Sequence, residues 1–451
     1  MVPPAPSWCR KARWRAAALL AVSLFASAFI ASSAPRPPNI VFILADDLGY
    51  GHLGSYGQRR IRTPRLDRMA GEGVRFTQAY AGSTVCAPSR ASLMTGLHQG
   101  HARIRGNTPR LPLRAEDVTI AEVLRGAGYR TAAIGKWGLG DAGTTGAPTR
   151  QGFDHWFGYL DQAHAHDSFT DHLWRDERRV AIPKGAFSHD LFTKEALDFV
   201  RRERNKPFFL YLAYTLPHAN STARRMDTPT EEPYAHEPWP APERAVAALV
   251  TRLDTDVGRL LDLIGELGLD RDTVVFFTSD NGPHREGGVD PAFHGASGPL
   301  RGIKRDLYEG GIRVPMIVRW PGRIAPGQVS DYVWAFWDVL PTAAELAGVS
   351  PPAGIDGLSV VPALVGGDPK PHEYLYWEFF ERGFQQAIRA ERWKGVRTGV
   401  GRPLELYDLS ADLAETSDAA AAHPDVVGRL ERLLNTARTD SPYWPTTTTQ
   451  R

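Results

Sequence analysis

Several apolar runs in this chain end abruptly in polar residues, and this pattern limits the possible folds more than any other feature. The runs cover residues 40–45, 129–134, 208–214 and 274–277. Near-continuous apolar runs are typical of strands that are buried on both faces of a mainly parallel sheet. Between them, residues 63–71 and 246–264 carry helix signals, the second with apolar residues spaced three and four apart. The alternation of strands and helices predicts an α/β fold.

The polar residues that follow these runs are candidates for one site, because ligands of such sheets bind beyond the carboxyl ends of the strands. Hard oxygen donors follow two of the runs, namely Asp46, Asp47, Asp280 and Asn281. Such donors suit calcium or magnesium better than zinc. Acidic pairs also cap turns, and Asn281 with Gly282 is a hairpin-turn signal. The unbroken apolar run before this pair and Pro283 after it favour the metal site.

The charge of the chain excludes one class of partner. The sequence of 451 residues has 53 Lys and Arg against 51 Asp and Glu, and four of the basic residues lie in the first 34 residues, which contain no acid. The remainder is therefore slightly acidic. Without a basic surplus, we expect no nucleic-acid partner.

The first 34 residues predict export. A basic start, an apolar run over 16–30 and small residues before Pro35 are typical of a secretory signal peptide, here residues 1–34. The run is shorter than the roughly 20 residues of a membrane-spanning helix. We therefore expect a periplasmic or secreted protein with no membrane span after cleavage; an uncleaved anchor is the alternative. Cleavage removes Cys9 and leaves Cys86, which then has no partner for an internal disulfide.

The pattern changes near residue 345. Short runs at 374–379, 387–396 and 404–409 precede a helical segment at 426–434. We therefore predict an α/β catalytic domain over residues 35–345 and a smaller α+β unit over 346–451, with an antiparallel sheet and a helix.

The segment around Cys86 carries the strongest chemical signal. Pro88 suits the first turn of a helix, which places Cys86 at a helix N-terminus, where backbone N–H groups favour an anion. Arg90 adds a cationic fork for a tetrahedral oxyanion. These features alone allow a thiolate nucleophile.

The same segment reads Cys-x-Pro-x-Arg followed by Ser-Leu-Met-Thr-Gly, which resembles the signature of the type I sulfatases. Further matches lie at 38–50, 63–67, 135–137, 279–282 and 304–315, so the resemblance spans roughly residues 37–435. It implies an alkaline-phosphatase-like fold, with a mainly parallel or mixed sheet between helices and a small C-terminal antiparallel sheet. It also implies an arylsulfatase-like enzyme that hydrolyses sulfate monoesters. Export and aromatic loops favour a sulfated carbohydrate as substrate, with aryl sulfates as artificial substrates.

The resemblance assigns roles to individual residues. A formylglycine-generating enzyme would oxidise Cys86 to Cα-formylglycine, whose hydrate attacks sulfur. Calcium, or magnesium as the alternative, would be bound by this residue together with Asp46, Asp47, Asp280 and Asn281. The sulfate oxygens would be held by Arg90, Lys136 and Lys304. His218 or Lys304 would protonate the departing alcohol; otherwise His218 is a structural histidine and Lys304 a solvated lysine.

One position departs from the family pattern. Many sulfatases read Gly-Lys-Trp-His-Leu-Gly where this chain has Gly138 in place of the histidine, which helps the hydrate to collapse. His164 or His166 is a candidate substitute; equally, both are substrate contacts or plain loop residues. His284 is a candidate contact of the leaving group.

The sequence is also compatible with other functions and with further substrate contacts. The same set of metal ligands would serve a phosphodiester or phosphonate monoester hydrolase. Gly138 is compatible with a noncatalytic glycan-binding relative. Six aromatic residues are candidate stacking faces for sugar rings, although isolated aromatics more often pack in cores: Trp156, Tyr159, Trp174, Tyr234, Trp239 and Trp377.

Overall fold

The computed structural model describes residues 1–3 and 36–446. From residue 4 onward, the predicted signal peptide lies outside the described residues. None of the helices in the described part combines the length and the apolar character that crossing a bilayer requires. Residues Pro37–Arg451 form one compact unit. The predicted division at residue 345 stays a prediction.

The centre of this unit is a mixed sheet of 11 strands within the described residues, in the order β10-β2-β9-β8-β1-β7-β3-β4-β5-β6, with β11 paired to β2. The strands are β1 (Asn39–Ala45), β2 (Val74–Tyr80), β3 (Arg130–Lys136), β4 (His155–Tyr159), β5 (His172–Arg175), β6 (Arg178–Ala181), β7 (Phe208–Ala213), β8 (Thr273–Ser279), β9 (Arg313–Arg319), β10 (Gln328–Ser330) and β11 (Trp334–Ala335). The four apolar runs became β1, β3, β7 and β8. These strands are neighbours and run parallel, so their carboxyl ends meet at one edge.

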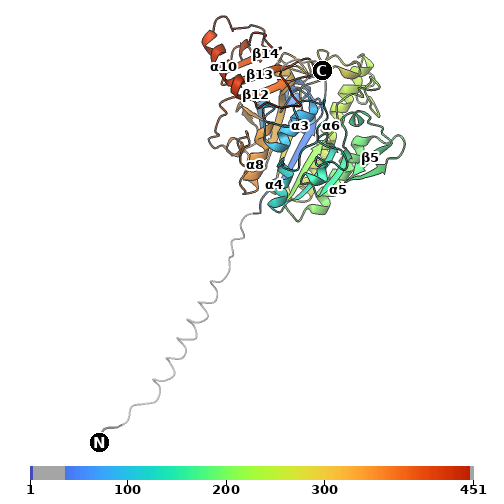
Figure 1. Cartoon of the computed structure of the whole chain (residues 1–451). Helices are drawn as coiled ribbons and strands as arrows, with labels where there is room; N and C mark the ends of the chain where they lie inside the picture. Colours follow the sequence, from blue (N-terminus) through green and yellow to red (C-terminus); the bar gives the residue numbers. More distant parts are fainter. Residues whose placement is uncertain (4–35, 447–451) are drawn as a thin grey trace. The chain divides into compact units, whose positions relative to one another are not determined.

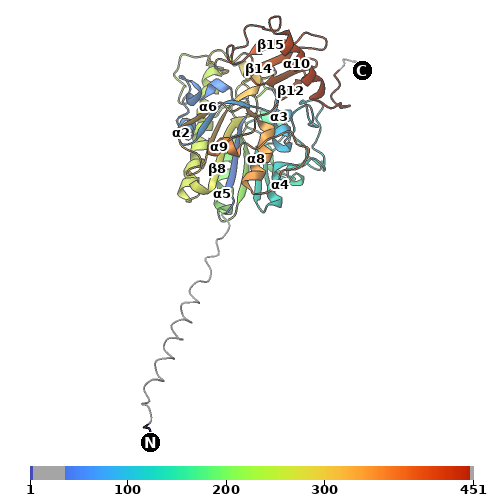
Figure 2. The same cartoon turned by 90° about the vertical axis from the view of Figure 1, so that its left-hand side faces the viewer.

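Helices cover both faces of the sheet. The helices of the described residues are α2 (Pro64–Gly71), α3 (Cys86–Thr95), α4 (Ile120–Gly126), α5 (Ser188–Glu203), α6 (Ala241–Glu266), α7 (Glu309–Ile312), α8 (Val339–Leu346), α9 (Val361–Val365) and α10 (Pro424–Thr436), of which α10 packs on the second sheet. Alternate residues of β1 enter two separate cores: Val41 and Ile43 pack with α2, α5 and α6, whereas Phe42 and Leu44 pack with α3, α4 and α8. Figure 2 shows α2 and α6 on one side of the sheet and α3 and α4 on the other. This two-sided burial explains the unbroken apolar runs, and the predicted fold class is confirmed.

A second, antiparallel sheet has the order β12-β13-β14-β15 and lies beside the main sheet, with α10, in orange to red in Figure 1. Its strands are β12 (Leu375–Phe379), β13 (Gln385–Ala390), β14 (Trp393–Arg397) and β15 (Glu405–Asp408). The predicted run 387–396 is two strands, because Glu391 adopts a left-handed turn at φ 54°. One face packs on α10, and the other packs on residues in and next to the main sheet, including Tyr80 at the end of β2 and Trp337.

A buried ionic cluster joins the two sheets. The Lys394 Nζ atom on β14 lies 2.9 Å from Glu309 Oε1 and 2.9 Å from Glu415 Oε1, and all three side chains are fully buried. Glu309 also accepts a hydrogen bond from the Tyr80 hydroxyl at 2.7 Å. A buried charge is tolerated when it is paired, and loss of one partner leaves the other uncompensated.

We expect the substitution Lys394→Met to lower the free energy of unfolding by about 3–5 kcal/mol, because it leaves two carboxylates facing each other without their shared cation. Urea denaturation measures this change. The matched control is Lys194→Met on α5, which removes a lysine whose side chain is 74% exposed and pairs with Asp198 at 2.6 Å. The control should change stability by less than about 1 kcal/mol. Equal effects of the two substitutions would contradict the role of the cluster.

Candidate functional site

The carboxyl ends of the central strands position the predicted acidic residues. Ala45 pairs with Ser279 in the parallel register of β1 and β8, so the pair that follows β1 lies beside the pair that follows β8. The Asp47 N–H donates to Asp280 Oδ1 at 3.0 Å, and Asp47 adopts a left-handed backbone at φ 64°. The structure therefore brings together Asp46, Asp47, Asp280 and Asn281, all fully buried.

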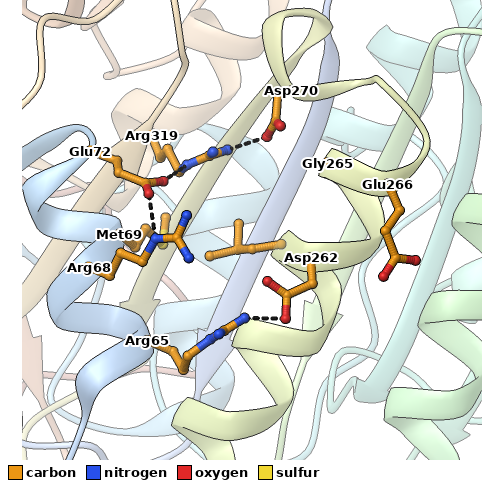
Figure 3. Close-up of a pocket in the computed structure, with 10 residues that line it drawn as sticks. Arg65, Arg68, Met69, Glu72, Asp262, Gly265, Glu266, Asp270 and Arg319 are labelled. Atoms are coloured by element: carbon orange, nitrogen blue, oxygen red, sulfur yellow. Dashed lines mark hydrogen bonds and ion pairs between the residues drawn. The ribbon is translucent and has the colours of Figure 1, made fainter.

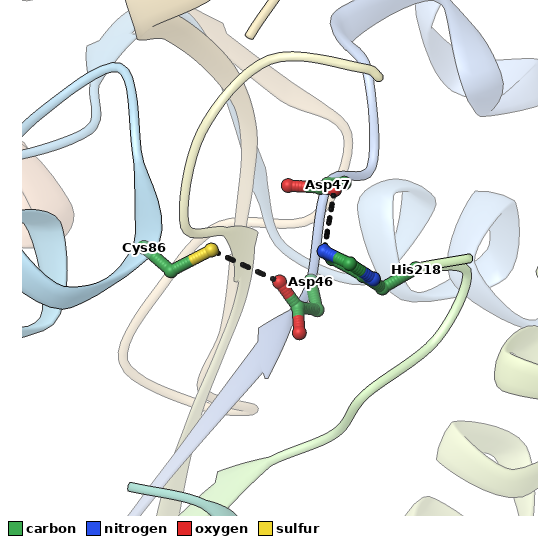
Figure 4. A group of neighbouring side chains, drawn as sticks. All are labelled: Asp46, Asp47, Cys86 and His218. Carbon is green, nitrogen blue, oxygen red and sulfur yellow. Dashed lines mark hydrogen bonds and ion pairs between the residues drawn. The ribbon is translucent and has the colours of Figure 1, made fainter. Parts of the chain in front are cut away.

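Cys86 begins α3 and faces these acids. Its Sγ atom lies 3.6 Å from Asp46 Oδ1 and 3.5 Å from the Nζ atom of Lys136. Figure 4 shows Asp46 facing Cys86 and Asp47 facing His218, with the two aspartates between them. One potential ligand atom of each of these four residues lies within 4.8 Å of the others. The predicted helix start at residue 86 is confirmed.

Three buried cations match the three carboxylates. Arg90 donates to Asp280 Oδ2 from Nη2 at 2.7 Å and from Nε at 3.1 Å. Lys136 Nζ lies 2.7 Å from Asp46 Oδ2, and Lys304 Nζ lies 2.8 Å from Asp47 Oδ2. The side chain of Lys304 is 3% exposed, so the alternative of a solvated lysine is wrong. The charges of the site are compensated, as buried charges must be.

Burial sets the protonation of two groups. It raises the pKa of the Cys86 thiol far above its usual range, against the opposing effect of Lys136 and Lys304. An unmodified thiol there stays protonated, which disfavours the thiolate nucleophile. Burial, followed by the charge of Asp46, also raises the pKa of Asp280 to about 6 despite Arg90. Further positive charge would therefore stabilise the ionised carboxylate.

The hydrogen bonds of the Asn281 side chain indicate whether a metal ion fits between the acidic residues. Its Nδ2 group donates to Asp47 Oδ1 at 2.7 Å and to the Gly282 carbonyl at 2.9 Å. Its Oδ1 atom is buried and has no hydrogen-bond partner among the described residues. A buried amide oxygen without a donor, beside three carboxylates, fits a hard cation such as calcium or magnesium. The hairpin alternative is wrong, because a long connection separates Asn281 from β9.

His218 and Lys304 form a pair next to the acids. His218 Nδ1 lies 2.6 Å from the carbonyl of Ala219, so this nitrogen is the donor, and Nε2 accepts from Lys304 Nζ at 3.1 Å. His218 Nε2 also lies 3.3 Å from Asp47 Oδ2. Lys304 Nζ therefore donates to His218 Nε2, and His218 Nδ1 donates to the Ala219 carbonyl.

The other predicted histidines separate into two groups. The ring of His166 stacks on His218 at 4.2 Å, and the ring of His284 lies 5.6 Å from His218. His164 instead contacts Thr170 Oγ1 at 2.7 Å and stacks on His172 at 4.2 Å. Only His166 and His284 therefore join His218, and their roles stay predictions. Burial, then Lys136 and Lys304, lowers the pKa of His166 to about 3, so this ring is neutral near pH 7.

Sequence reasoning missed the acidic rim of this site. Glu286 Oε2 lies 3.8 Å from His218 Nε2, and Glu286 Oε1 accepts from Arg305 at 2.8 Å. Arg305, left-handed at φ 76°, also contacts Glu381 Oε2 at 2.9 Å. Asn107 donates to Glu381 Oε1 at 3.2 Å. The sequence signals were the positions of Arg305 next to Lys304 and of Glu286 two residues after His284. Asn107 and Glu381 come from distant loops.

Most of the candidate stacking aromatics are core residues. Trp156, Tyr159, Tyr234 and Trp377 are at most 1% exposed. Trp174 and Trp239 are partly buried and pack against the two main cores. For the four buried rings, the packing alternative is confirmed.

Two other features resemble sites but have most of their polar groups already paired. The hollow between α2 and α6 in Figure 3 is lined by charges, most of which pair among themselves, including Arg319 with Glu72 at 2.6 Å and with Asp270 at 2.8 Å. In the group of His98, His101 and Asp356, His98 Nδ1 accepts from the Gly100 N–H at 3.1 Å. Its proton therefore lies on Nε2, toward Asp356, where a metal would need a lone pair.

We expect the substitution Asn281→Ala to weaken calcium binding at least roughly 10-fold, because it removes the amide oxygen that has no protein donor. Calorimetric titration with calcium measures the affinity. Asn435→Ala, at an exposed position of α10, is the matched control and should bind as the unchanged protein does. An unchanged affinity in Asn281→Ala would remove this residue from the metal site.

Comparisons with known proteins agree with this geometry. Residues 38–349 match the profile of the Sulfatase family, and residues 303–440 match that of the N-sulphoglucosamine sulphohydrolase C-terminal region. N-acetylgalactosamine-6-sulfatase of Rattus norvegicus is 36% identical over 78% of this chain and 70% of its own length. N-acetylgalactosamine-6-O-sulfatase of Bacteroides thetaiotaomicron is 30% identical over 90% of this chain and 94% of its own. The solved structure of Ps i-CgsB in complex with k-i-k-neocarrahexaose has a TM-score of 0.82 and 27% identity, covering 92% of this chain and 96% of that one.

Proposed function

Since the chain belongs to the sulfatase family of sulfuric ester hydrolases, we propose that it is an exported, calcium-dependent sulfatase of carbohydrates that uses Cα-formylglycine made from Cys86. The observation that carries the proposal is the buried space in front of residue 86, where an unpartnered amide oxygen and three carboxylates lie beside three cations. A formylglycine-generating enzyme would act on Cys86 during maturation. The predicted signal peptide supports a periplasmic or secreted location.

In the proposed site, the metal ion, the modified residue 86 and the buried cations have different roles. Calcium would be held by Asp46, Asp47, Asp280 and Asn281 with residue 86, where it would polarise the sulfate, and the hydrated formylglycine would supply the attacking oxygen. The protein itself fixes the cations that face the reacting group. Arg90 donates from Nη1 to the Lys136 carbonyl at 2.8 Å in addition to its two bonds to Asp280. These contacts hold its guanidinium in place before substrate binds.

Lys136 and Lys304 flank residue 86 and bind sulfate oxygens in this proposal. Negative charge grows on those oxygens and on the leaving oxygen as the S–O bond breaks. Cations that are already in place, inside a space without bulk water, stabilise this charge more strongly than mobile ions in water do.

The leaving alcohol would take its proton at the pair of Lys304 and His218. The Nδ1 proton of His218 is committed to the Ala219 carbonyl, so the mobile proton of the pair lies on Lys304 Nζ. We infer that Lys304 supplies this proton and that His218 directs it to the departing oxygen.

The relatives support a sulfated sugar as the substrate. Two of them are named for sulfated N-acetylgalactosamine, and a similar structure was solved with a neocarrahexaose. The carboxylates of Glu286 and Glu381 near this site are suited to accept hydrogen bonds from sugar hydroxyls. We therefore propose N-acetylgalactosamine 6-sulfate as the first carbohydrate substrate to test.

A substrate panel tests the reaction class. We expect hydrolysis of N-acetylgalactosamine 6-sulfate and of an aryl sulfate to exceed that of phenylphosphonate and of a phosphodiester. The substitution Cys86→Ala should lower the sulfatase kcat roughly 10⁴-fold or more, because it removes the nucleophile. Unchanged thermal unfolding of this variant would show that the fold is kept. Faster turnover of the phosphonate or the phosphodiester would favour that enzyme class instead, and binding of the sugar without any turnover would favour a glycan-binding relative.

The role of Lys304 predicts a dependence on the leaving group. We expect Lys304→Met to lower kcat for the sugar sulfate roughly 10²- to 10⁴-fold more than for an aryl sulfate, because an alcohol needs a proton to depart and a phenolate does not. Steady-state kinetics on both substrates measure this difference. Lys184→Met, at an exposed loop position, is the control. Equal losses on the two substrates would limit Lys304 to sulfate binding.

A further inference from the structure

We propose that the acidic rim, which consists of Glu286, Arg305 and Glu381, determines which sugars this site accepts. The rim would accept a leaving sugar whose groups beside the sulfate ester are neutral hydroxyls, and it would disfavour a sugar that carries a second anionic group there. The proposal rests on the proposed function, because it assigns a contact to the leaving sugar of a sulfate ester.

The rim begins at the pair that protonates the leaving group in the proposed function. Glu286 Oε1 lies 3.9 Å from Lys304 Nζ, and Glu286 Oε2 lies 3.8 Å from His218 Nε2. A leaving oxygen that takes a proton from Lys304 lies about 3 Å from Nζ, and therefore at most about 7 Å from Glu286 Oε1 in any orientation of the substrate. Charges interact over such a distance, because the screening length in physiological salt is about 8 Å.

The three side chains of the rim lie at the boundary between the buried site and solvent. The side chain of Lys304 is 3% exposed. Those of Glu286, Arg305 and Glu381 are 20%, 31% and 28% exposed, respectively. A sugar whose sulfate group enters the buried space would keep its other groups at this boundary, where the rim is accessible to them.

Hydrogen bonds fix the rim relative to the chain on either side of the nucleophile. The Arg305 N–H donates to the Thr84 carbonyl at 3.1 Å, and its guanidinium contacts the carboxylates of both glutamates. The Asn107 side chain accepts from the Ala87 N–H at 3.0 Å and donates to Glu381 Oε1 at 3.2 Å. The carboxylates are therefore in place before a sugar binds, which lowers the entropic cost of binding.

The rim carries an uncompensated negative charge. Its two carboxylates share a single guanidinium. Against the raising effect of burial, the charge of Lys304 lowers the pKa of Glu286 below its usual range, so this carboxyl group is ionised near pH 7. Arg382, which follows Glu381 in the chain, pairs with Asp306 at 3.1 Å and adds no net charge. Ionised carboxylates accept hydrogen bonds from hydroxyls and repel a second anion, so the same groups favour one sugar and oppose the other.

The substitution Glu381→Gln tests this selectivity, because glutamine keeps the size of the side chain and removes its charge. The affinities for N-acetylgalactosamine 6-sulfate and for N-acetylgalactosamine 4,6-disulfate are measured calorimetrically in Cys86→Ala protein, which lacks the nucleophile. We expect the 6-sulfate to bind more tightly than the disulfate, and Glu381→Gln to lower this ratio of affinities roughly 3- to 10-fold. The ratio of the two kcat/KM values in oxidised protein should fall by a similar factor.

Two further variants separate charge from structure. Arg305→Gln removes the positive charge of the rim and should raise the ratio of affinities, opposite to Glu381→Gln. Glu266→Gln, at the exposed end of α6 that precedes β8, removes a carboxylate beyond the opposite end of this strand and should leave the ratio unchanged. A rim that had merely lost its structure would weaken the binding of both sugars by the same factor and would not change the ratio.

The results distinguish this proposal from the proposed function. If the unchanged protein hydrolyses sulfate esters and Glu381→Gln retains the ratio of affinities, the assignment of the rim is overturned and the function stands. If the unchanged protein hydrolyses no sulfate ester, the function fails, while the ratios of affinities still decide the assignment. Tighter binding of the disulfate by protein with an unchanged rim, or binding of neither sugar, would also overturn the proposal.

Discussion

Three buried carboxylates and three buried cations share one water-poor space at the carboxyl ends of the central strands, and each carboxylate has its own cation within 2.7–2.8 Å. Removal of a charged group from water is costly, and the cost is offset only when the geometry of the pair is maintained. The fold must therefore hold six side chains from distant parts of the chain in register. A divalent cation and a sulfate monoester bring charges of opposite sign, so together they add little net charge to this space.

The sheet topology meets this requirement. The adjacent parallel strands β8, β1, β7 and β3 deliver Asp280, the pair Asp46 and Asp47, the loop of His218, and Lys136 to one edge. The start of α3 adds Cys86 and Arg90 from the side, and the connection between β8 and β9 adds Lys304. The second sheet is joined to this frame through Lys394 and contributes Glu381 near the site. The second sheet is therefore tied to the frame and also takes part in the rim.

The sequence predicted the features that depend on local pattern. The apolar runs located the central strands, and the polar residues after them located the acids that the structure brings together, because strand ends converge in any parallel sheet. The Cys86 motif located the helix start. Glu286 and Glu381 were not found, since their contacts depend on loops that meet only after folding. The aromatic residues were ambiguous for a related reason: a ring such as Trp156 has the same sequence signal in a core as at a sugar site. The split of residues 387–396 into two strands depended on a single left-handed residue, Glu391.

Gly138 shows that a local departure from a family pattern can be interpreted only when its neighbours in the fold are known. In the sequence it is a missing side chain, with two histidines downstream as candidate substitutes. In the structure, His164 turns to Thr170 and His166 stacks on His218. The space beside Gly138 is occupied by the side chain of Gln162, which no sequence pattern indicated.

The central claim is that residue 86, once oxidised and placed against the calcium-binding acids, is the nucleophile of a sulfatase. The most direct measurement is mass spectrometry of the peptide that contains residue 86, combined with sulfate release from N-acetylgalactosamine 6-sulfate, on samples that differ in the extent of oxidation. The account predicts that the rate of sulfate release increases in proportion to the fraction of aldehyde. Equal rates in fully oxidised and unoxidised samples would contradict it.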